Sequence, residues 1–328
     1  MQKWIGWGFS FFLIVWAQEE TAKSCGKCHL SIYEEWSKST HARASTSPDF
    51  IKMLGDLKNI KLQQENEKNC FPCHLPNPIL PKLTLPTLRK SIKEEGITCI
   101  TCHQKGKTEI LCGPFETPDA PHEWEKHKAF ESAQLCLNCH TNGSGDAVYF
   151  LQDSYLSWKK SKGKDAKTCQ ECHMPEIERA LAQKGDVQSK RLGRKHTFEG
   201  RWLGTAKASA SEFNEILLKK ALTLEIQKDS WGVAVQATNS GCGHSFPGMG
   251  YVTAELELVA FNNGKEVFRK SQVLAEWLKG KPDQRLLPDQ KKKLDYKTIE
   301  TLTKVEIYLS MRFQNQGFSF LYATKEFK

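Results

Sequence analysis

The chain has 328 residues, of which 39% are hydrophobic and 26% charged, and its formal net charge is +9. This length predicts about two domains, and the apolar fraction is low for a chain that must build two cores from side chains alone. A positive charge would suit nucleic acid, but the lysines are scattered rather than grouped, which argues against nucleic-acid binding.

The first residues, 1–17, predict a secretory signal peptide. Lys3 supplies a positive charge, Trp4 to Trp16 form an apolar run, and Val15-Trp16-Ala17 is an acceptable cleavage site. The apolar run has about thirteen residues, whereas a membrane-spanning helix needs about twenty. We therefore expect cleavage near Ala17 and a periplasmic or extracellular mature protein; the alternative is an uncleaved membrane anchor.

The strongest pattern in the sequence is Cys-x-x-Cys-His, which occurs five times. A chain with 12 Cys and 10 His would contain about 0.01 such motifs by chance. The motif attaches c-type haem: both thiols form thioether bonds, and the histidine becomes an axial iron ligand. A zinc site or a redox dithiol would explain one motif but not five on an exported chain. The motifs are, in chain order, Cys25, Cys28 and His29; Cys70, Cys73 and His74; Cys99, Cys102 and His103; Cys136, Cys139 and His140; and Cys169, Cys172 and His173.

Five motifs predict five covalently bound haem c groups. Their propionates would add about ten negative charges and so balance the positive charge of the polypeptide. The motifs occupy 25–173, which leaves about thirty residues for each haem. Because so little polypeptide cannot wrap each haem separately, we expect the haems to pack against one another and to form much of the core. Such packing is also what rapid electron transfer requires.

Between the motifs, the sequence predicts short helices joined by turns. The expected helices span 50–69, 87–95, 123–135, 146–162 and Pro175 to about Gly185. Four prolines make 75–85 an extended or turning segment.

After about residue 200 the apolar pattern changes to a period of two, which indicates strands. Alternation occurs over 231–237, 252–260 and 305–311, Asn262-Asn263-Gly264 predicts a hairpin turn, and Phe318-Ser319-Phe320 predicts a final strand. We therefore predict an α+β protein. A mainly helical or irregular pentahaem domain over 18–200 would be followed by a β-rich, sandwich-like domain over 201–328.

Five histidines outside the motifs equal the motifs in number, which predicts a histidine on both faces of each iron. They are His41, His122, His127, His196 and His244. His41 follows Tyr33 and Trp36, whose rings suit packing on a porphyrin. His244 lies in a glycine-rich loop, and glycines let a backbone approach a flat cofactor closely.

The other three histidines have less specific surroundings. His122 and His127 are five residues apart, so on a helix they would point about 140° apart and would serve two different irons. His196 lies at the predicted domain junction, and Met249 is the well-placed thioether alternative. If all five irons have two protein ligands, none is open to a substrate, which favours an electron carrier over an enzyme.

Two cysteines, Cys112 and Cys242, lie outside the motifs. In an oxidising compartment they could form a disulfide, which would join the haem region to the loop of His244. Free buried thiols and an axial thiolate are the alternatives.

Several segments together resemble those of the cytochrome c-554-like multihaem cytochromes, which are related to hydroxylamine oxidoreductase and pentahaem nitrite reductase. The similar segments are Cys25 to His41 with Tyr33, Trp36 and Ser39; Gly96-Ile97-Thr98-Cys99; Gly113-Pro114-Phe115 with Pro121-His122 and the fourth motif; Cys172-His173-Met174-Pro175; and His244 to Gly248 with Asp283 to Pro288. The resemblance implies a helical multihaem fold, bis-histidine irons and electron transfer, with His41, His122, His196 and His244 as distal ligands. The Cys-x-x-Cys-Lys site of pentahaem nitrite reductases is absent from the sequence, which weighs against that activity.

The sequence thus predicts a secreted pentahaem cytochrome c that passes electrons between redox partner proteins. One alternative is a reductase or dehydrogenase that acts on a small nitrogen or sulfur compound at one five-coordinate haem, with His127 as the histidine that does not ligate. Another is a subunit of an extracellular cytochrome filament. Association with membrane redox complexes and homo-oligomerisation both stay open.

Overall fold

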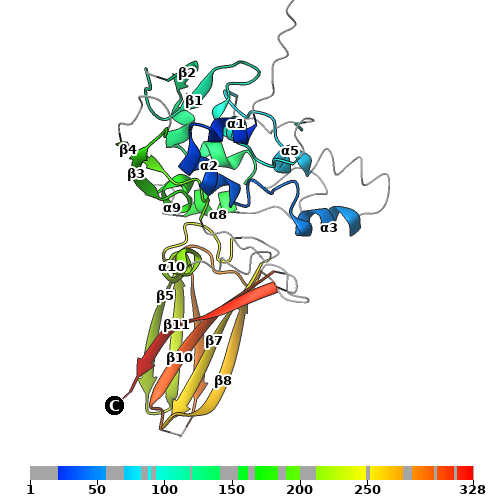
Figure 1. The fold of residues 1–328 in the computed structure, drawn as a ribbon. Coiled ribbons are helices and arrows are strands. Elements are labelled where there is room, and N and C mark those ends of the chain that lie inside the picture. Colours follow the sequence, from blue (N-terminus) through cyan, green and yellow to red (C-terminus); the bar gives the residue numbers. More distant parts are fainter. Residues whose placement is uncertain are drawn as a thin grey trace, which may run out of the picture.

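The structure is a computed structural model that describes residues 21–56, 70–82, 88–89, 94–118, 120–140, 154–161, 167–183, 190–199, 212–248, 252–275, 283–298, 301–313 and 316–327. Short helices and turns dominate the first part of the chain, and long strands form the second (Figure 1). The predicted signal peptide and the predicted boundary at residue 200 lie outside the described residues. Within the described ranges, no helix is long and apolar enough to cross a membrane.

Each Cys-x-x-Cys-His motif lies on or beside a short helix. The motif helices are α1 (Ala22–Gly26), α5 (Phe71–His74), α6 (Cys99–His103), α7 (Gln134–Leu137) and α9 (Cys169–His173). In α6 and α9 both cysteines are helical, and their spacing of three residues places the two thiols on the same helix face. The other helices that the structure describes before residue 200 are α2 (Leu30–Ser37), α3 (Pro48–Asp56), the 3-10 helix η1 (Lys128–Glu131) and α8 (Ser154–Lys160).

Two of the predicted helices are wrong. Over 123–135 the chain forms β2 (Trp124–Lys126), which pairs in parallel with β1 (Leu111–Gly113), and then η1 and α7. After Pro175 it forms a hairpin of β3 (Glu176–Ala180) and β4 (Lys190–Arg194).

Pro175 favoured the prediction of a helix here, but the burial pattern of the segment after it explains the β3–β4 hairpin. Glu176 and Glu178 are exposed, whereas Arg179 is buried and forms an ion pair with Glu35 at 2.7 Å. The segment therefore alternates with a period of two, as a strand does. The predicted helices over 50–69 and 146–162 are described only in part, as α3 and α8, and most of 87–95 lies outside the described residues.

The strands of the second part form two antiparallel sheets around one core, as the alternation predicted. One sheet has the order β5-β6-β9, with β5 (Leu222–Asp229), β6 (Gly232–Asn239) and β9 (Lys291–Lys297). The other has the order β11-β10-β7-β8, with β7 (Thr253–Asn262), β8 (Lys265–Leu274), β10 (Lys304–Phe313) and β11 (Gln316–Glu326). Helix α10 (Glu212–Ala221) leads directly into β5 (Figure 1).

The predicted hairpin turn joins β7 to β8. Asn262 pairs with Lys265, and the two residues between them, Asn263 and Gly264, have φ angles of 47° and 82°. Positive φ at both central residues is the type I′ geometry that Asn-Gly favours. The prediction from this tripeptide is confirmed.

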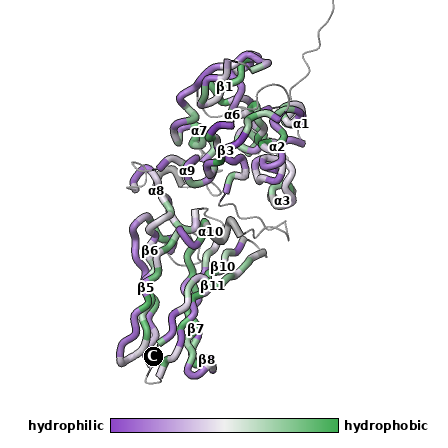
Figure 2. The backbone as a smooth tube through the Cα atoms, turned by 60° about the vertical axis from the view of Figure 1, so that its left-hand side comes forward, coloured by the Kyte–Doolittle hydropathy of each residue, from purple (hydrophilic) through white to green (hydrophobic). Residues whose placement is uncertain are grey.

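Apolar burial differs strongly between the two parts. Nineteen buried residues form one continuous core between the two sheets. In the described residues before 200, the buried apolar clusters are Ala22, Trp36 and Ala42, and Leu80, Cys112 and Ala129. Along the strands, hydrophobic and hydrophilic residues alternate, as Figure 2 shows. The helical part is therefore short of protein core, as expected if haem macrocycles complete it.

Candidate haem-binding site

Four of the five motif histidines are held through Nδ1 by a backbone carbonyl. The distances are 2.7 Å from His29 to Leu181 O, 2.6 Å from His74 to Ala44 O, 2.7 Å from His103 to Cys112 O and 2.5 Å from His173 to Glu199 O. Because a carbonyl oxygen only accepts, Nδ1 carries the proton and the lone pair of Nε2 is free. This is the tautomer that a metal ligand needs, and the carbonyl fixes the orientation of its ring.

In three pairs of histidines, the two imidazole rings lie at the same distance from each other. The ring centroids are 6.2 Å apart in each of His41–His140, His103–His196 and His173–His244. A metal bound by imidazole nitrogens at about 2.0 Å on either side would hold the ring centroids about 6 Å apart. Each pair joins one motif histidine to one spare histidine. The spacing therefore fits an iron with a histidine on both faces.

Burial favours the neutral form of the three spare imidazoles in these pairs, and neutral imidazole is the form that binds iron. Burial, with a smaller effect from His140, lowers the pKa of His41 to about 3. Burial, followed by His103, lowers the pKa of His196 to about 3. For His244, too, burial is the main cause of a lowered pKa. Nδ1 of His41 is buried and has no hydrogen-bond partner in the described part of the chain.

His41 is positioned by the segment that leads into the third motif. Ile97 N donates to His41 O at 2.9 Å, and Gly96 N donates to Ala42 O at 3.1 Å. A Cβ atom on Gly96 would lie 2.6 Å from His41 O, so only glycine allows this approach. The indole of Trp36 donates to Ile97 O at 2.8 Å and so connects α2 to the same segment.

His196 is positioned by a buried ion pair. Glu35 on α2 accepts a hydrogen bond from His196 N at 2.8 Å and pairs with Arg179 of β3. Nδ1 of His196 donates to Arg194 O at 3.0 Å. These contacts leave Nε2 free. Neither Glu35 nor Arg179 was singled out from the sequence, because residues 144 positions apart along the chain give no local signal.

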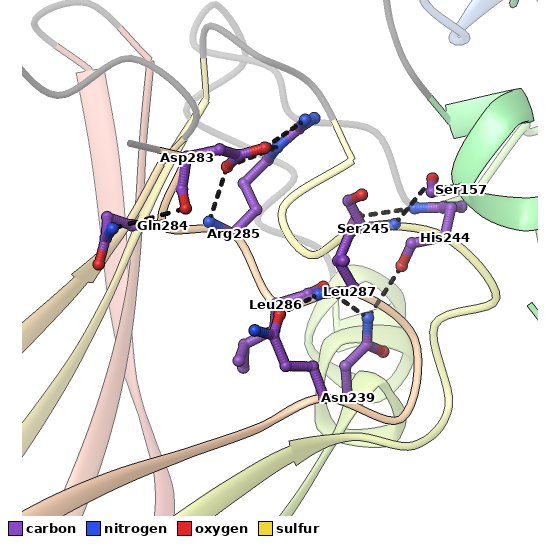
Figure 3. A network of polar contacts seen from close by, with 10 residues as sticks. Ser157, Asn239, His244, Ser245, Asp283, Gln284, Arg285, Leu286 and Leu287 are labelled. Atoms are coloured by element: carbon purple, nitrogen blue, oxygen red, sulfur yellow. Dashed lines mark hydrogen bonds and ion pairs between the residues drawn. The ribbon is translucent and has the colours of Figure 1, made fainter. Parts of the chain in front are cut away.

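His244 is supplied by the loop between β6 and β7 and reaches the helical part of the protein (Figure 3). Asn239 Nδ2 donates to His244 O at 2.9 Å, which holds the loop to the sheet. Ser245 N donates to the hydroxyl of Ser157 on α8 at 3.1 Å. A Cβ atom on Gly248 would lie 2.7 Å from Cε1 of His244. The loop is thus built closely around this imidazole.

His122 and His127 have different surroundings. His127 caps η1: its Nδ1 accepts a hydrogen bond from Ala129 N at 3.2 Å. A neutral imidazole that accepts at Nδ1 carries its proton on Nε2, which is then not free to bind iron. His122 is exposed and lies with Pro121 and Trp124 at a cavity of about 600 Å³. Among the described residues, neither ring faces a motif histidine as the three pairs do.

The thiols of different motifs lie side by side. Side-chain hydrogen bonds join Cys25 to Cys99, Cys73 to Cys139 and Cys136 to Cys169. Cys102 lies within electrostatic range of both cysteines of the fourth motif, and burial raises its pKa to about 11. The first and third motifs are therefore neighbours, and the fourth motif has the second, third and fifth around it.

Cys28 differs from these cysteines, because the described residues give its thiol no contact with another motif. It lies in the turn after α1 rather than on that helix, and Cys28 N donates to Cys25 O at 3.2 Å. Cys28 O accepts a hydrogen bond from Gln183 N at 2.9 Å, which joins the first motif to the segment after β3. Its thiol is half-buried and free. Attachment of haem at Cys28 therefore stays a prediction that rests on the motif and on this turn.

Two more motif cysteines, Cys172 and Cys70, are half-buried free thiols. Burial raises the pKa of Cys70, with a smaller effect from Cys73. Burial also raises the pKa of Cys172, and Cys242 contributes to the same shift. Both thiols therefore stay protonated until they react, as that of Cys102 does.

Of the alternatives that the sequence left open for the two spare cysteines, the structure shows free thiols rather than a disulfide. Cys112 is buried in the cluster with Leu80 and Ala129. Cys242 instead lies beside the haem ligand candidate His244, with Sγ 3.3 Å from Nδ1, and burial raises its pKa to about 12.

Comparison with known proteins finds two similarities. Residues 24–104, which include the first three motifs, match the family model of cytochrome c554 and c-prime. Among solved structures, the chain is similar to a pentahaem cytochrome c552 from Thermochromatium tepidum, with a TM-score of 0.61 and 17% sequence identity over 94% of this chain and 99% of that chain. No curated protein gives a significant match.

Proposed function

We propose that this chain is a multihaem cytochrome c that carries electrons between redox partner proteins through five closely packed haem c groups, as its similarities to such proteins support. The observation that supports this most directly is the common 6.2 Å separation of three pairs, each with one motif and one spare histidine. An iron with histidine on both faces has no open position and is suited to electron transfer.

The residues present fit haem c. The ten motif cysteines, Cys28 among them, would form the thioether bonds, and the five motif histidines would bind the irons from one side. His41, His196 and His244 would bind three of the irons from the other side. The haem supplies a centre that alternates between ferric and ferrous iron. The chain orients the imidazoles, and burial favours the neutral form of His41, His196 and His244.

The neighbouring thiols support a branched path for electrons. The contacts between motifs place the first motif beside the third, the third beside the fourth, and the fourth beside the fifth. The second motif also lies beside the fourth, so the path branches there. Because each haem is attached through its motif cysteines, haems on neighbouring motifs lie close together. The paths from the first haem to the fifth and from the first haem to the second are equally long. We therefore assign one end of electron transfer to the first haem and the other to the fifth or the second.

We place the protein in the periplasm or outside the cell, with cleavage near Ala17. Covalent haem attachment outside the cytoplasm and the apolar run before Ala17 support this location. Partners there would be soluble redox proteins or membrane redox complexes.

One observation favours a second candidate, reduction or oxidation of a small nitrogen or sulfur compound at one haem. Nδ1 of His127 accepts a hydrogen bond, so four spare histidines are left for five irons. An iron without a histidine on its second face could bind such a compound. The structure brings His29 and His74 of the first and second motifs opposite no spare histidine within its described residues.

Denaturing mass spectrometry of the exported protein tests the haem count. The expected mass is that of the processed chain plus five haems, and replacing both cysteines of one motif by alanine should remove one haem. A mass with fewer than five haems in the natural chain would contradict the proposal.

A further inference from the structure

Arg285, in the segment before β9, is a charged residue almost without contact with water. Its side chain is 2% exposed. Nε and Nη2 of Arg285 donate to the carboxylate of Asp283 at 3.1 and 2.8 Å. A guanidinium keeps its charge even when buried. The Asp283 side chain is 41% exposed, so water screens its negative charge more than the charge of the buried guanidinium.

The backbone places Arg285 next to the loop of His244. Phe246 and Leu286 form a two-way bridge, with N to O distances of 2.8 and 2.9 Å. Asn239 Nδ2 donates to both His244 O and Leu286 O, at 2.9 Å each. Ser245 comes directly before Phe246 in the chain and Arg285 directly before Leu286, so the bridge brings Ser245 and Arg285 close together. Burial is the main cause of the lowered pKa of His244, and the charge of Arg285 contributes to it.

Ser245 provides a second, independent sign of a ligand. Its side chain is 0% exposed, and its Oγ has no hydrogen-bond partner in the described residues. A buried hydroxyl without a partner costs free energy, so native structures rarely leave one unsatisfied. Figure 3 shows Ser245 with Arg285 on one side and His244 on the other. A hydroxyl and a guanidinium beside a haem ligand together suit a carboxylate.

We propose that Ser245 and Arg285 bind a propionate of the haem held between His173 and His244, and that this raises the reduction potential of that haem. The inference rests on the proposed function, since it requires the haem. Ferric haem has one more positive charge than ferrous haem. A propionate without a buried counter-charge would favour the ferric state, and the guanidinium cancels that preference.

The test is a potentiometric titration of the five-haem protein, followed by visible spectroscopy. Arg285→Gln should lower one midpoint potential of the five, and Ser245→Ala should lower the same one by less. Asp283→Asn removes a negative charge from the pair and should move this potential in the opposite direction. Arg269→Gln, at an exposed arginine with its own carboxylate partners on β7 and β8, should change none of the five.

The variant His244→Ala identifies the affected haem. The haem that loses its low-spin signal in His244→Ala should be the same haem whose midpoint potential is lowered in Arg285→Gln. Mass spectrometry first shows that each variant holds five haems, so a failure of the proposed function is seen separately. Unchanged potentials in both Ser245→Ala and Asp283→Asn would overturn the inference, even if Arg285→Gln did not fold. A shift at a different haem would overturn it too.

Discussion

At the scale of single residues, hydrogen bonds at Nδ1 decide what each histidine can do. In His29, His74, His103 and His173, a carbonyl accepts a hydrogen bond from Nδ1 and leaves Nε2 free. In His127 a backbone amide occupies Nδ1 instead. The same residue type is thus suited to bind iron in one place and to cap a helix in another.

The contact between Gly248 and His244 gives a prediction at this scale. In Gly248→Ala, the new Cβ would lie 2.7 Å from Cε1 of His244 and would push the imidazole away from its place opposite His173. We expect one of the low-spin haem signals to weaken in the electron paramagnetic resonance spectrum. Gly113→Ala is the control, because nothing lies within 4 Å of its added Cβ. An unchanged spectrum in Gly248→Ala would contradict the geometry.

The cap formed by His127 gives a second prediction. His127→Ala should leave every haem signal unchanged and should lower the free energy of unfolding by about 1 kcal/mol, the usual cost of losing a helix cap. His127→Asn should restore most of that stability, since asparagine also caps helices. Visible spectra and chemical denaturation measure the two effects. A new high-spin signal in His127→Ala would show that His127 binds iron after all.

At the scale of elements, tight turns fix the register of the sandwich on which the His244 loop depends. Gly232 begins β6 with φ of 146°, and a Cβ there would lie 1.9 Å from Tyr296 O on β9. No other residue type fits this position without moving β9 away from β6. The turn therefore determines how the three-stranded sheet is paired.

Gly232→Ala should destabilise the sandwich by about 1–3 kcal/mol, the cost of a strained backbone at such a position. Its neighbour Trp231 is 68% exposed, so Trp231→Ala should change stability by less than about 0.5 kcal/mol. Thermal unfolding followed by circular dichroism of the strands compares the two variants. Equal melting temperatures would refute the prediction.

At the scale of the whole molecule, the two parts differ in what fills them. The sandwich has its own continuous core, whereas the helical part has small clusters such as Leu80, Cys112 and Ala129 among its described residues. The hydrophobic effect can therefore fold the sandwich from side chains alone, but the helical part needs haem.

Without haem, the sandwich should still fold, whereas the helical part should not. When the chain is produced without haem attachment, we expect a circular dichroism spectrum with strand signal and a cooperative melting transition, while proteolysis digests the helical part. The test is limited proteolysis with mass mapping of the protected fragment. Protection of 21–199 without haem would contradict this account of its core.

The sequence predicted what depends on local spacing, which includes five motifs, a period of two after residue 200 and the Asn263-Gly264 turn. It did not predict the β3–β4 hairpin, because the burial of Arg179 depends on Glu35 far away in the chain. The resemblance already set His127 apart from the other spare histidines, but the sequence did not predict its cap at Ala129, which is a matter of backbone geometry. Cysteine counting alone suggested the Cys112–Cys242 disulfide, which the separate environments of the two thiols do not support.

Electron paramagnetic resonance of the oxidised protein tests the central claim most directly. The three pairs predict low-spin ferric haems with two histidine ligands, and His41→Ala, His196→Ala and His244→Ala should each convert one different haem to high spin. A natural protein with mainly high-spin haem, or variants that keep all their low-spin signals, would contradict the account.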